Sequence, residues 1–159
     1  MRGLVQIFVV VLLGVFAGCV FAQDDENTIL GVWITAKGKA QVEISTQENA
    51  IAGYIIWLKE PFFPENDEQG MAGKPKIDRE NPDPELRKQT VIGLQIISGF
   101  QYKGDGEWKG GTVYDPENGK TYKGKIWLTA EGTLKVRGFI GILLFGRTEE
   151  WLPVTRRRH

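Results

Sequence analysis

The sequence predicts an all-β fold, a small antiparallel β-barrel with few short helical turns. Short apolar runs, several of them alternating with polar residues, follow one another after residue 22 and are separated by turn residues. No long stretch has helical periodicity. The expected strands number about eight to ten, and closing them into a barrel removes exposed sheet edges. A β-sandwich is the alternative arrangement of the same strands.

The N-terminal segment, residues 1–22, has the pattern of a secretory signal peptide. Arg2 supplies a positive charge, Leu4–Phe16 is a nearly unbroken apolar run, and a small-x-small cleavage site ends at Ala22. We therefore expect a periplasmic or secreted protein with no transmembrane span after cleavage. A second interpretation stays open, because the four residues ending at Cys19 are similar to a bacterial lipobox. Lipidation of Cys19 would make the protein a lipoprotein.

Composition excludes several classes of function. The 159 residues include 20 basic and 20 acidic side chains, so no charge excess favours nucleic acid as a partner. The only cysteine is Cys19 and the only histidine is His159. The mature chain therefore has no disulfide, no histidine-based catalytic triad and no histidine-based zinc site. We expect a single domain over 23–153, followed by a solvated basic tail at 154–159. For this domain we expect no cofactor, no metal site and no enzymatic activity.

The first strands are expected before residue 59. Gly31–Ala36 is an apolar run, and a turn at Lys37-Gly38-Lys39 leads to Ala40–Ser45, which alternates between apolar and polar residues. Ile51–Leu58 is apolar almost throughout. That pattern indicates either burial on both faces or an aromatic-rich outer face.

Residues 59–90 are expected to form a long loop, because the segment holds five prolines and many charges. One helical turn is expected after Asp83, which has the N-cap position, with Pro84 at the first helical position. Six carboxylates in this loop are expected to be solvated surface charges. A pair of them acting as acid and base on envelope sugars is the alternative. The six are Glu65, Asp67, Glu68, Asp78, Glu80 and Asp83.

Strands are expected to resume over Val91–Ser98, Gly99–Tyr102 and Trp108–Tyr114. Residues 115–119, Asp-Pro-Glu-Asn-Gly, predict a hairpin turn whose backbone is capped by Asp115, and Thr121–Lys123 is the expected return strand. The final strand is expected over Arg147–Leu152.

The best specified hairpin has a three-residue loop at 130–132. This loop places Leu128 opposite Leu134 and Ile126 opposite Val136, so apolar residues pair with apolar residues on one face. The same register places Lys125 opposite Arg137, although like charges directly across a hairpin repel. Either an acidic residue on the next strand, Glu149 or Glu150, compensates them, or this face binds an anion.

Several of these motifs resemble a bacterial exported family known as domain of unknown function 2147. The resemblance covers about Ile29 to Pro153 and departs from the family pattern where Leu152-Pro153 follows Trp151. The family implies a lipocalin-like barrel and brings no activity. The matching motifs are Gly31-Val32-Trp33, Gly53 to Leu58, Asp78 with Asn81 to Arg87, Gly93-Leu94, Trp108 to Tyr122, Val136-Arg137-Gly138, and Gly146-Arg147-Thr148 with Trp151.

The lipocalin resemblance implies a structural pair, in which Trp33 closes the barrel base and stacks under Arg147 from the last strand. The residues expected to have structural roles are Trp33, Asp115, Arg147 and Trp151.

The leading expectation is a non-enzymatic exported protein. It binds a small hydrophobic or anionic ligand, or it associates with the envelope. A carboxylate-based hydrolase and a lipidated structural protein of the envelope are the alternatives. The expected ligand-binding residues are amphipathic aromatics and one cation, as in many small-molecule sites: Tyr54, Trp57, Tyr114, Tyr122 and Arg137.

Overall fold

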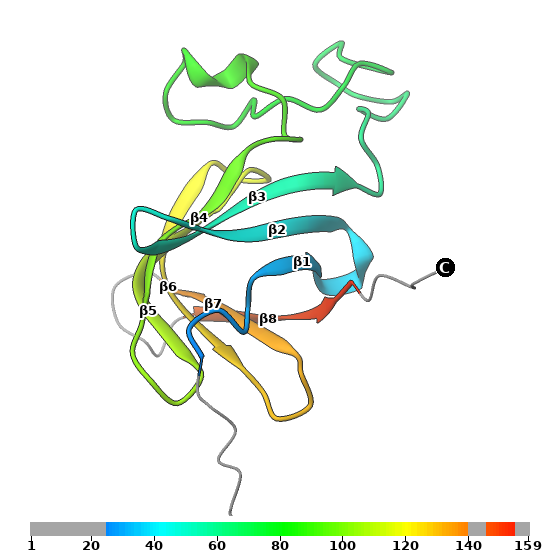
Figure 1. The fold of residues 1–159 in the computed structure, drawn as a ribbon. Coiled ribbons are helices and arrows are strands. Elements are labelled where there is room, and N and C mark those ends of the chain that lie inside the picture. Colours follow the sequence, from blue (N-terminus) through cyan, green and yellow to red (C-terminus); the bar gives the residue numbers. More distant parts are fainter. Residues whose placement is uncertain (1–24, 140–145, 155–159) are drawn as a thin grey trace, which may run out of the picture.

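Eight antiparallel strands form a closed barrel in which each strand pairs with the next and β8 pairs with β1 (Figure 1). The computed structural model describes residues 25–139 and 146–154, so the predicted signal peptide, Cys19 and residues 155–159 lie outside it. The predicted barrel is confirmed and the sandwich alternative is wrong. The strands are β1 (Gly31–Ile34), β2 (Ala40–Gln47), β3 (Ala50–Leu58), β4 (Gln95–Tyr102), β5 (Glu107–Asp115), β6 (Lys120–Leu128), β7 (Leu134–Phe139) and β8 (Gly146–Pro153).

Helical structure in the described residues is limited to two 3-10 turns, η1 (Ala36–Gly38) and η2 (Leu86–Lys88). The second lies in the segment where one helical turn is expected, but it starts at Leu86 with Glu85 at the N-cap, so the prediction of Asp83 as N-cap is wrong. The Asp83 carboxylate accepts a hydrogen bond from the backbone N–H of Glu85 at 3.0 Å instead. Within the part of the chain that is described, no helix has the length and apolar character needed to cross a bilayer.

The expected strand at Val91–Ser98 begins late, at Gln95. The chain turns at Gly93, whose φ of +94° favours glycine, and the Gly93 N–H donates to the carbonyl of Ile55 at 2.7 Å. Val91 is buried and its N–H donates to the carbonyl of Lys76 at 3.0 Å, so it belongs to the end of the long segment. The strand then continues through Gly99, where the sequence predicts a break.

The predicted β6–β7 hairpin register is confirmed. Leu128 pairs with Leu134, Ile126 with Val136, and Lys125 with Arg137. Ile126, Leu134 and Val136 are buried, so this set of residues faces the barrel interior and the alternating set faces outward.

One end of the barrel interior is filled by large side chains centred on Phe100 of β4. Phe100 is completely buried, and it fits because its neighbours on β5 and β6 are glycines. A Cβ at Gly111 would lie 2.3 Å from the Phe100 ring, and a Cβ at Gly124 would lie 2.4 Å from it. These glycines therefore form a slot for one aromatic ring. Among the described residues, the other large apolar side chains that are fully buried are Ile29, Val42, Ile44, Ile97, Trp108, Ile126 and Leu134.

The predicted stack of Trp33 under Arg147 is wrong. Trp33 is buried, and its indole N–H donates to the carbonyl of Ile29 at 2.8 Å. Trp33 pairs with Pro153 at the end of β8, whereas Arg147 pairs with Gly138 near its start. Six residues of strand separate the two levels by roughly 20 Å. The Arg147 side chain is 78% exposed and pairs instead with Glu149.

We expect Trp33→Ala to destabilise the protein by about 3–5 kcal/mol, because it removes a large buried side chain. Arg147→Ala is the matched control and is expected to cost at most about 1 kcal/mol, since its ion pair is exposed. Urea unfolding of both variants measures the difference. An Arg147→Ala variant as unstable as Trp33→Ala would restore the stacking interpretation.

Candidate ligand-binding cavity

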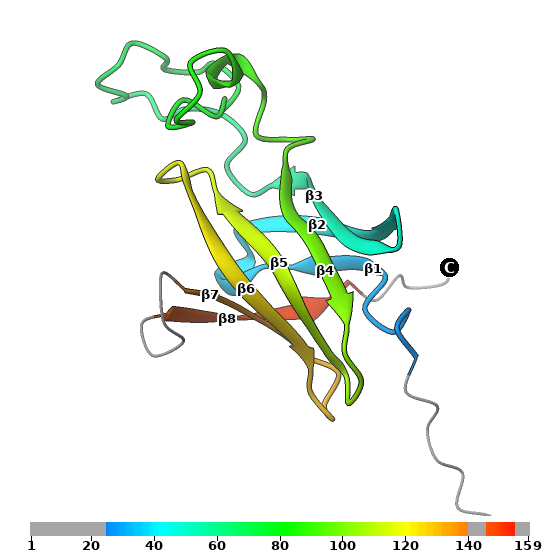
Figure 2. The same ribbon diagram turned by 90° about the vertical axis from the view of Figure 1, so that its left-hand side faces the viewer.

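A cavity of about 850 Å³ opens at one end of the barrel. This is the end where the segment between β3 and β4 projects beyond the strands in both views (Figures 1 and 2). The volume lies within the range of small-molecule sites, roughly 300–1,000 Å³. The inner wall is apolar and is built from strand residues and the end of the long segment, namely Ala40, Ile55, Val91, Ile96, Val113, Val136 and Trp151.

The long segment between β3 and β4 folds on itself through two isolated β-bridges. Phe62 pairs with Pro75, and Ile77 pairs with Thr90. Within the segment, Arg79 donates to the carboxylate of Asp67 at 2.7 Å and stacks over the ring of Phe63 at 4.4 Å. The predicted long loop is therefore a structured element of the cavity wall.

A buried carboxylate fastens this segment to the barrel. Asp78 is completely buried, and its two oxygens accept hydrogen bonds from the Tyr114 hydroxyl and the Asn81 side-chain amide, each at 2.7 Å. Burial, together with the bond to Asp78, raises the pKa of the Tyr114 hydroxyl. Arg87 donates to the carbonyl of Asn81 at 2.7 Å. Asp78, Asn81 and Tyr114, which we call the latch, join the segment to β5.

The β5–β6 turn contacts the long segment beside the latch. Asp115 caps this turn as predicted, because its carboxylate accepts the backbone N–H of Glu117 at 2.9 Å. Gly119 has a φ of +68°, and a Cβ there would lie 1.8 Å from the carbonyl oxygen of Glu80. Only glycine allows this approach, so the turn and the segment are in close contact.

Two of the six loop carboxylates differ from the expectation of solvated surface charge. Asp78 is buried in the latch, and only 3% of the Asp67 side chain is exposed. The hydrogen bond from Arg79 holds the pKa of Asp67 below its usual value, with backbone N–H donors adding to the effect. The sequence pattern did not reveal this, because each partner is brought in by the folded segment. No group of three acidic, cysteine or histidine side chains that could hold a metal ion occurs among the described residues.

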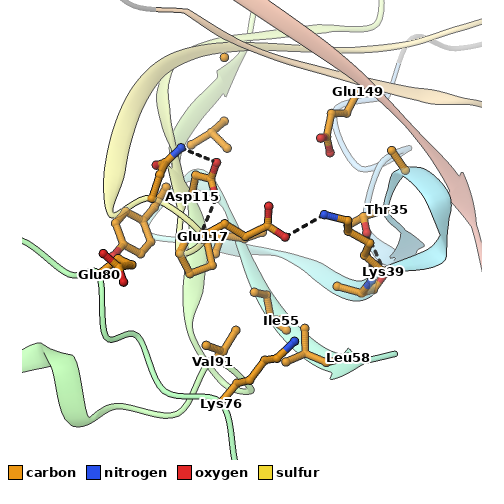
Figure 3. A pocket seen from close by; sticks show the side chains of 18 of the residues that line it. Thr35, Lys39, Ile55, Leu58, Lys76, Glu80, Val91, Asp115, Glu117 and Glu149 are labelled. Carbon is orange, nitrogen blue, oxygen red and sulfur yellow. Dashed lines mark hydrogen bonds and ion pairs between the residues drawn. The ribbon is translucent and has the colours of Figure 1, made fainter. Parts of the chain in front are cut away.

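Charged side chains surround the mouth of the cavity. Lys39, just before β2, donates to Glu117 of the β5–β6 turn at 2.8 Å, and Figure 3 shows the two side chains extended toward each other. Glu149 of β8 accepts from Arg147 at 3.2 Å and from the indole N–H of Trp151 at 3.3 Å. The hydrogen bond to Glu117 is the main reason why the pKa of Lys39 is raised, and the negative charge of Glu149 raises it further.

The five predicted ligand-binding residues do not share one pocket. Tyr114 and Tyr122 line the cavity. Tyr54, Trp57 and Arg137 do not, because their side chains lie on the outer face of the barrel.

The positions of these residues follow from strand geometry. The Tyr54 hydroxyl donates to Gln47 at 2.9 Å on the surface, and Trp57 is 41% exposed. This confirms an aromatic outer face for β3. Arg137 alternates with the inward residue Val136, so the hairpin register itself contained the signal that it faces outward.

The like-charged pair on the β6–β7 hairpin is compensated by a different residue from the two predicted. Lys125 forms an ion pair with Glu107 of β5, the strand on its other side. Arg137 donates to the hydroxyl of Thr148 at 3.0 Å. Of the two predicted partners, Glu150 pairs with Lys135 and Glu149 lines the cavity.

We expect Glu107→Gln to destabilise the protein at neutral pH and to flatten its acid sensitivity. Hydrogen bonds from Lys109 and then Lys125 lower the pKa of Glu107 from its usual 4.5. A lowered folded-state pKa contributes stability above the unfolded-state pKa, and this is lost as the pH falls through the folded-state pKa. Urea unfolding of wild type and variant at pH 7 and at pH 3 measures the effect. Equal losses at both pH values would contradict it.

Comparisons with known proteins agree with this architecture. The protein HP1028 from the human pathogen Helicobacter pylori, described as belonging to the lipocalin family, superposes with a TM-score of 0.65. The match has 24% sequence identity and covers 79% of this chain and 82% of that one, so it shows a shared fold. The comparison with curated proteins returned no match. The sequence model of the family described as "Uncharacterized protein conserved in bacteria (DUF2147)" matches residues 31–152, and the chain therefore belongs to that family.

Proposed function

We propose that this protein is an exported, non-enzymatic carrier that binds a small, largely apolar molecule in the barrel cavity. The observation that carries the proposal is the division of the barrel interior. One end is filled around Phe100, whereas the other holds a cavity of about 850 Å³ with an apolar inner wall. Burying apolar ligand surface in such a cavity supplies binding free energy of about 25 cal/mol per Å².

The hydrolase alternative has less support from the cavity. Five acidic side chains line the cavity, and each has a partner. Glu117 pairs with Lys39, and Glu149 pairs with Arg147. Glu60 and Glu80 pair with Lys76 and Arg79, and Asp115 caps the β5–β6 turn. A glycoside hydrolase needs two carboxyl groups that face the sugar, one to protonate the leaving oxygen and one to attack or to activate water. Asp67 and Asp78 are held by contacts within the long segment and the latch.

Binding is tested first by native mass spectrometry of protein purified from its own envelope, where we expect a retained small molecule. A second test uses N-phenyl-1-naphthylamine, a neutral apolar probe whose fluorescence rises on binding. Val136→Trp fills the cavity from β7 and is expected to abolish the signal, with a thermal melt to verify folding. Trp57→Ala, on the outer face, is the control and should leave binding unchanged. Equal signals from both variants would contradict binding in the cavity.

Export is the second part of the proposal. Residues 1–22 carry the signal-peptide pattern, and we expect a mature chain that begins at Gln23 in the periplasmic or secreted fraction. N-terminal sequencing with intact mass measurement tests this. A chain beginning at an acylated Cys19 would make the protein a lipoprotein instead, and an uncleaved chain in the cytoplasm would contradict export.

A further inference from the structure

Four charged side chains at the cavity mouth form a set with no net charge. We call Lys39, Glu117, Arg147 and Glu149 the mouth cluster. Lys39 pairs with Glu117 at 2.8 Å, and Arg147 pairs with Glu149 at 3.2 Å. All four residues line the cavity. The charges of the two pairs also interact, because Glu149 raises the pKa of Lys39 and Arg147 lowers it.

The mouth cluster comes from well-separated parts of the barrel. Lys39 precedes β2, Glu117 lies between β5 and β6, and the other two residues are on β8. In a closed barrel of eight sequential strands, β2 and β6 stand opposite each other. The pair of Lys39 and Glu117 therefore spans the opening, as Figure 3 shows, and a ligand that enters the cavity meets it.

The charge around the whole opening is also nearly balanced. The described residues lining the cavity include six basic and five acidic side chains. A simple anion would attract the cations but leave the carboxylates facing a like charge, and a simple cation would do the reverse. The basic residues are Lys37, Lys39, Lys59, Lys76, Arg79 and Arg147, and the acidic residues are Glu60, Glu80, Asp115, Glu117 and Glu149.

We propose that the cavity takes an amphiphile with a zwitterionic head, whose anionic group binds Lys39 and Arg147 and whose cationic group binds Glu117 and Glu149. The inference rests on the proposed function, since the apolar wall has to hold the chain of the same molecule. The pair of Lys39 and Glu117 is 59% and 72% exposed. Exposed ion pairs are weak, so exchanging their partners for ligand charges has a small cost.

The test compares dodecyl compounds that share one chain and differ in the head, each below its critical micelle concentration. Isothermal titration calorimetry should show dodecylphosphocholine binding about tenfold more tightly than dodecanoate, dodecyltrimethylammonium or dodecyl maltoside. Phosphocholine without a chain should not bind measurably, which distinguishes a zwitterionic amphiphile from a free zwitterion.

Two variants should shift the preference in opposite directions. Lys39→Met leaves the mouth cluster with a net negative charge and should favour dodecyltrimethylammonium, whereas Glu117→Gln leaves a net positive charge and should favour dodecanoate. Lys123→Met, on the exposed outer face of β6, is the control and should keep the wild-type order.

The outcomes separate this inference from the proposed function. Equal affinity for all four dodecyl compounds would overturn the zwitterion assignment while supporting an apolar carrier. Tightest binding of dodecanoate by the wild type would replace it with an anion site. Tight binding of phosphocholine alone would overturn the role of the apolar chain. Failure of every probe, N-phenyl-1-naphthylamine included, would overturn both the inference and the proposed function.

Discussion

Phe100→Ala is expected to destabilise the protein by about 3–5 kcal/mol, as much as Trp33→Ala, because both remove a large buried aromatic side chain. Phe100 is completely buried and fills the space that Gly111 and Gly124 leave open on the facing strands. Removing the ring leaves a void that these glycines cannot close. The midpoint of urea unfolding measures the loss. Phe62→Ala, at a side chain that is 55% exposed, is the control and should change stability by no more than about 0.5 kcal/mol.

The slot itself is tested by a double-mutant cycle. Gly124→Ala is expected to be destabilising in the wild type, because its Cβ would lie 2.4 Å from the Phe100 ring and 3.1 Å from Val113. In a Phe100→Leu background the cost should shrink, since the ring is gone. Strictly additive effects of the two substitutions would show that Gly124 is not selected by Phe100.

Asp78→Ala is also expected to cost about 3–5 kcal/mol, through lost hydrogen bonds and not through a lost apolar side chain. It leaves the Tyr114 hydroxyl and the Asn81 amide without their acceptor, and a hydrogen bond to a charged group contributes about 1.5–3 kcal/mol. Hydrogen exchange should show the loss concentrated in residues 76–91, because the latch fastens this segment to β5. Unchanged exchange in that segment would contradict the latch.

Tyr114→Phe is the matched variant, since it removes one donor and keeps the ring. Its expected cost is about 1–3 kcal/mol. Together with Asp78→Ala it forms a cycle, and the double variant should cost less than the sum because both changes break the same hydrogen bond. Asp83→Ala, at an exposed carboxylate in the same segment, is the control and should have the smaller effect of losing one exposed hydrogen bond to the backbone.

The local sequence pattern was enough to predict the strands and the hairpins that join them. The β6–β7 register was predictable because its apolar residues pair on one face, and the Asp115 turn was predictable because its residue types satisfy the turn backbone themselves. The barrel was predictable because closing many short strands into a barrel removes the exposed sheet edges.

Strand irregularities set which face some residues occupy, and alternation alone misplaces them. A register shift between β2 and β3 lies beside Trp57. Strict alternation would place Tyr54 and Trp57 on opposite faces of β3. With the shift, both stay outside the cavity, where the Tyr54 hydroxyl reaches Gln47 and Trp57 is 41% exposed.

The sequence by itself determined the all-β class, the sequential strand order of the hairpins and the family, because these depend on residues that are close in the chain. Tertiary structure alone decided the burial of Asp78 against Tyr114 and the pairing of Lys39 with Glu117 across the opening. These partners are 36 and 78 residues apart. Packing of the long segment against β5 brings the first pair together, and the curvature of the barrel brings the second pair together. A carboxylate in a charged loop has the same sequence pattern whether it is solvated or buried, so only the folded contacts distinguish the two.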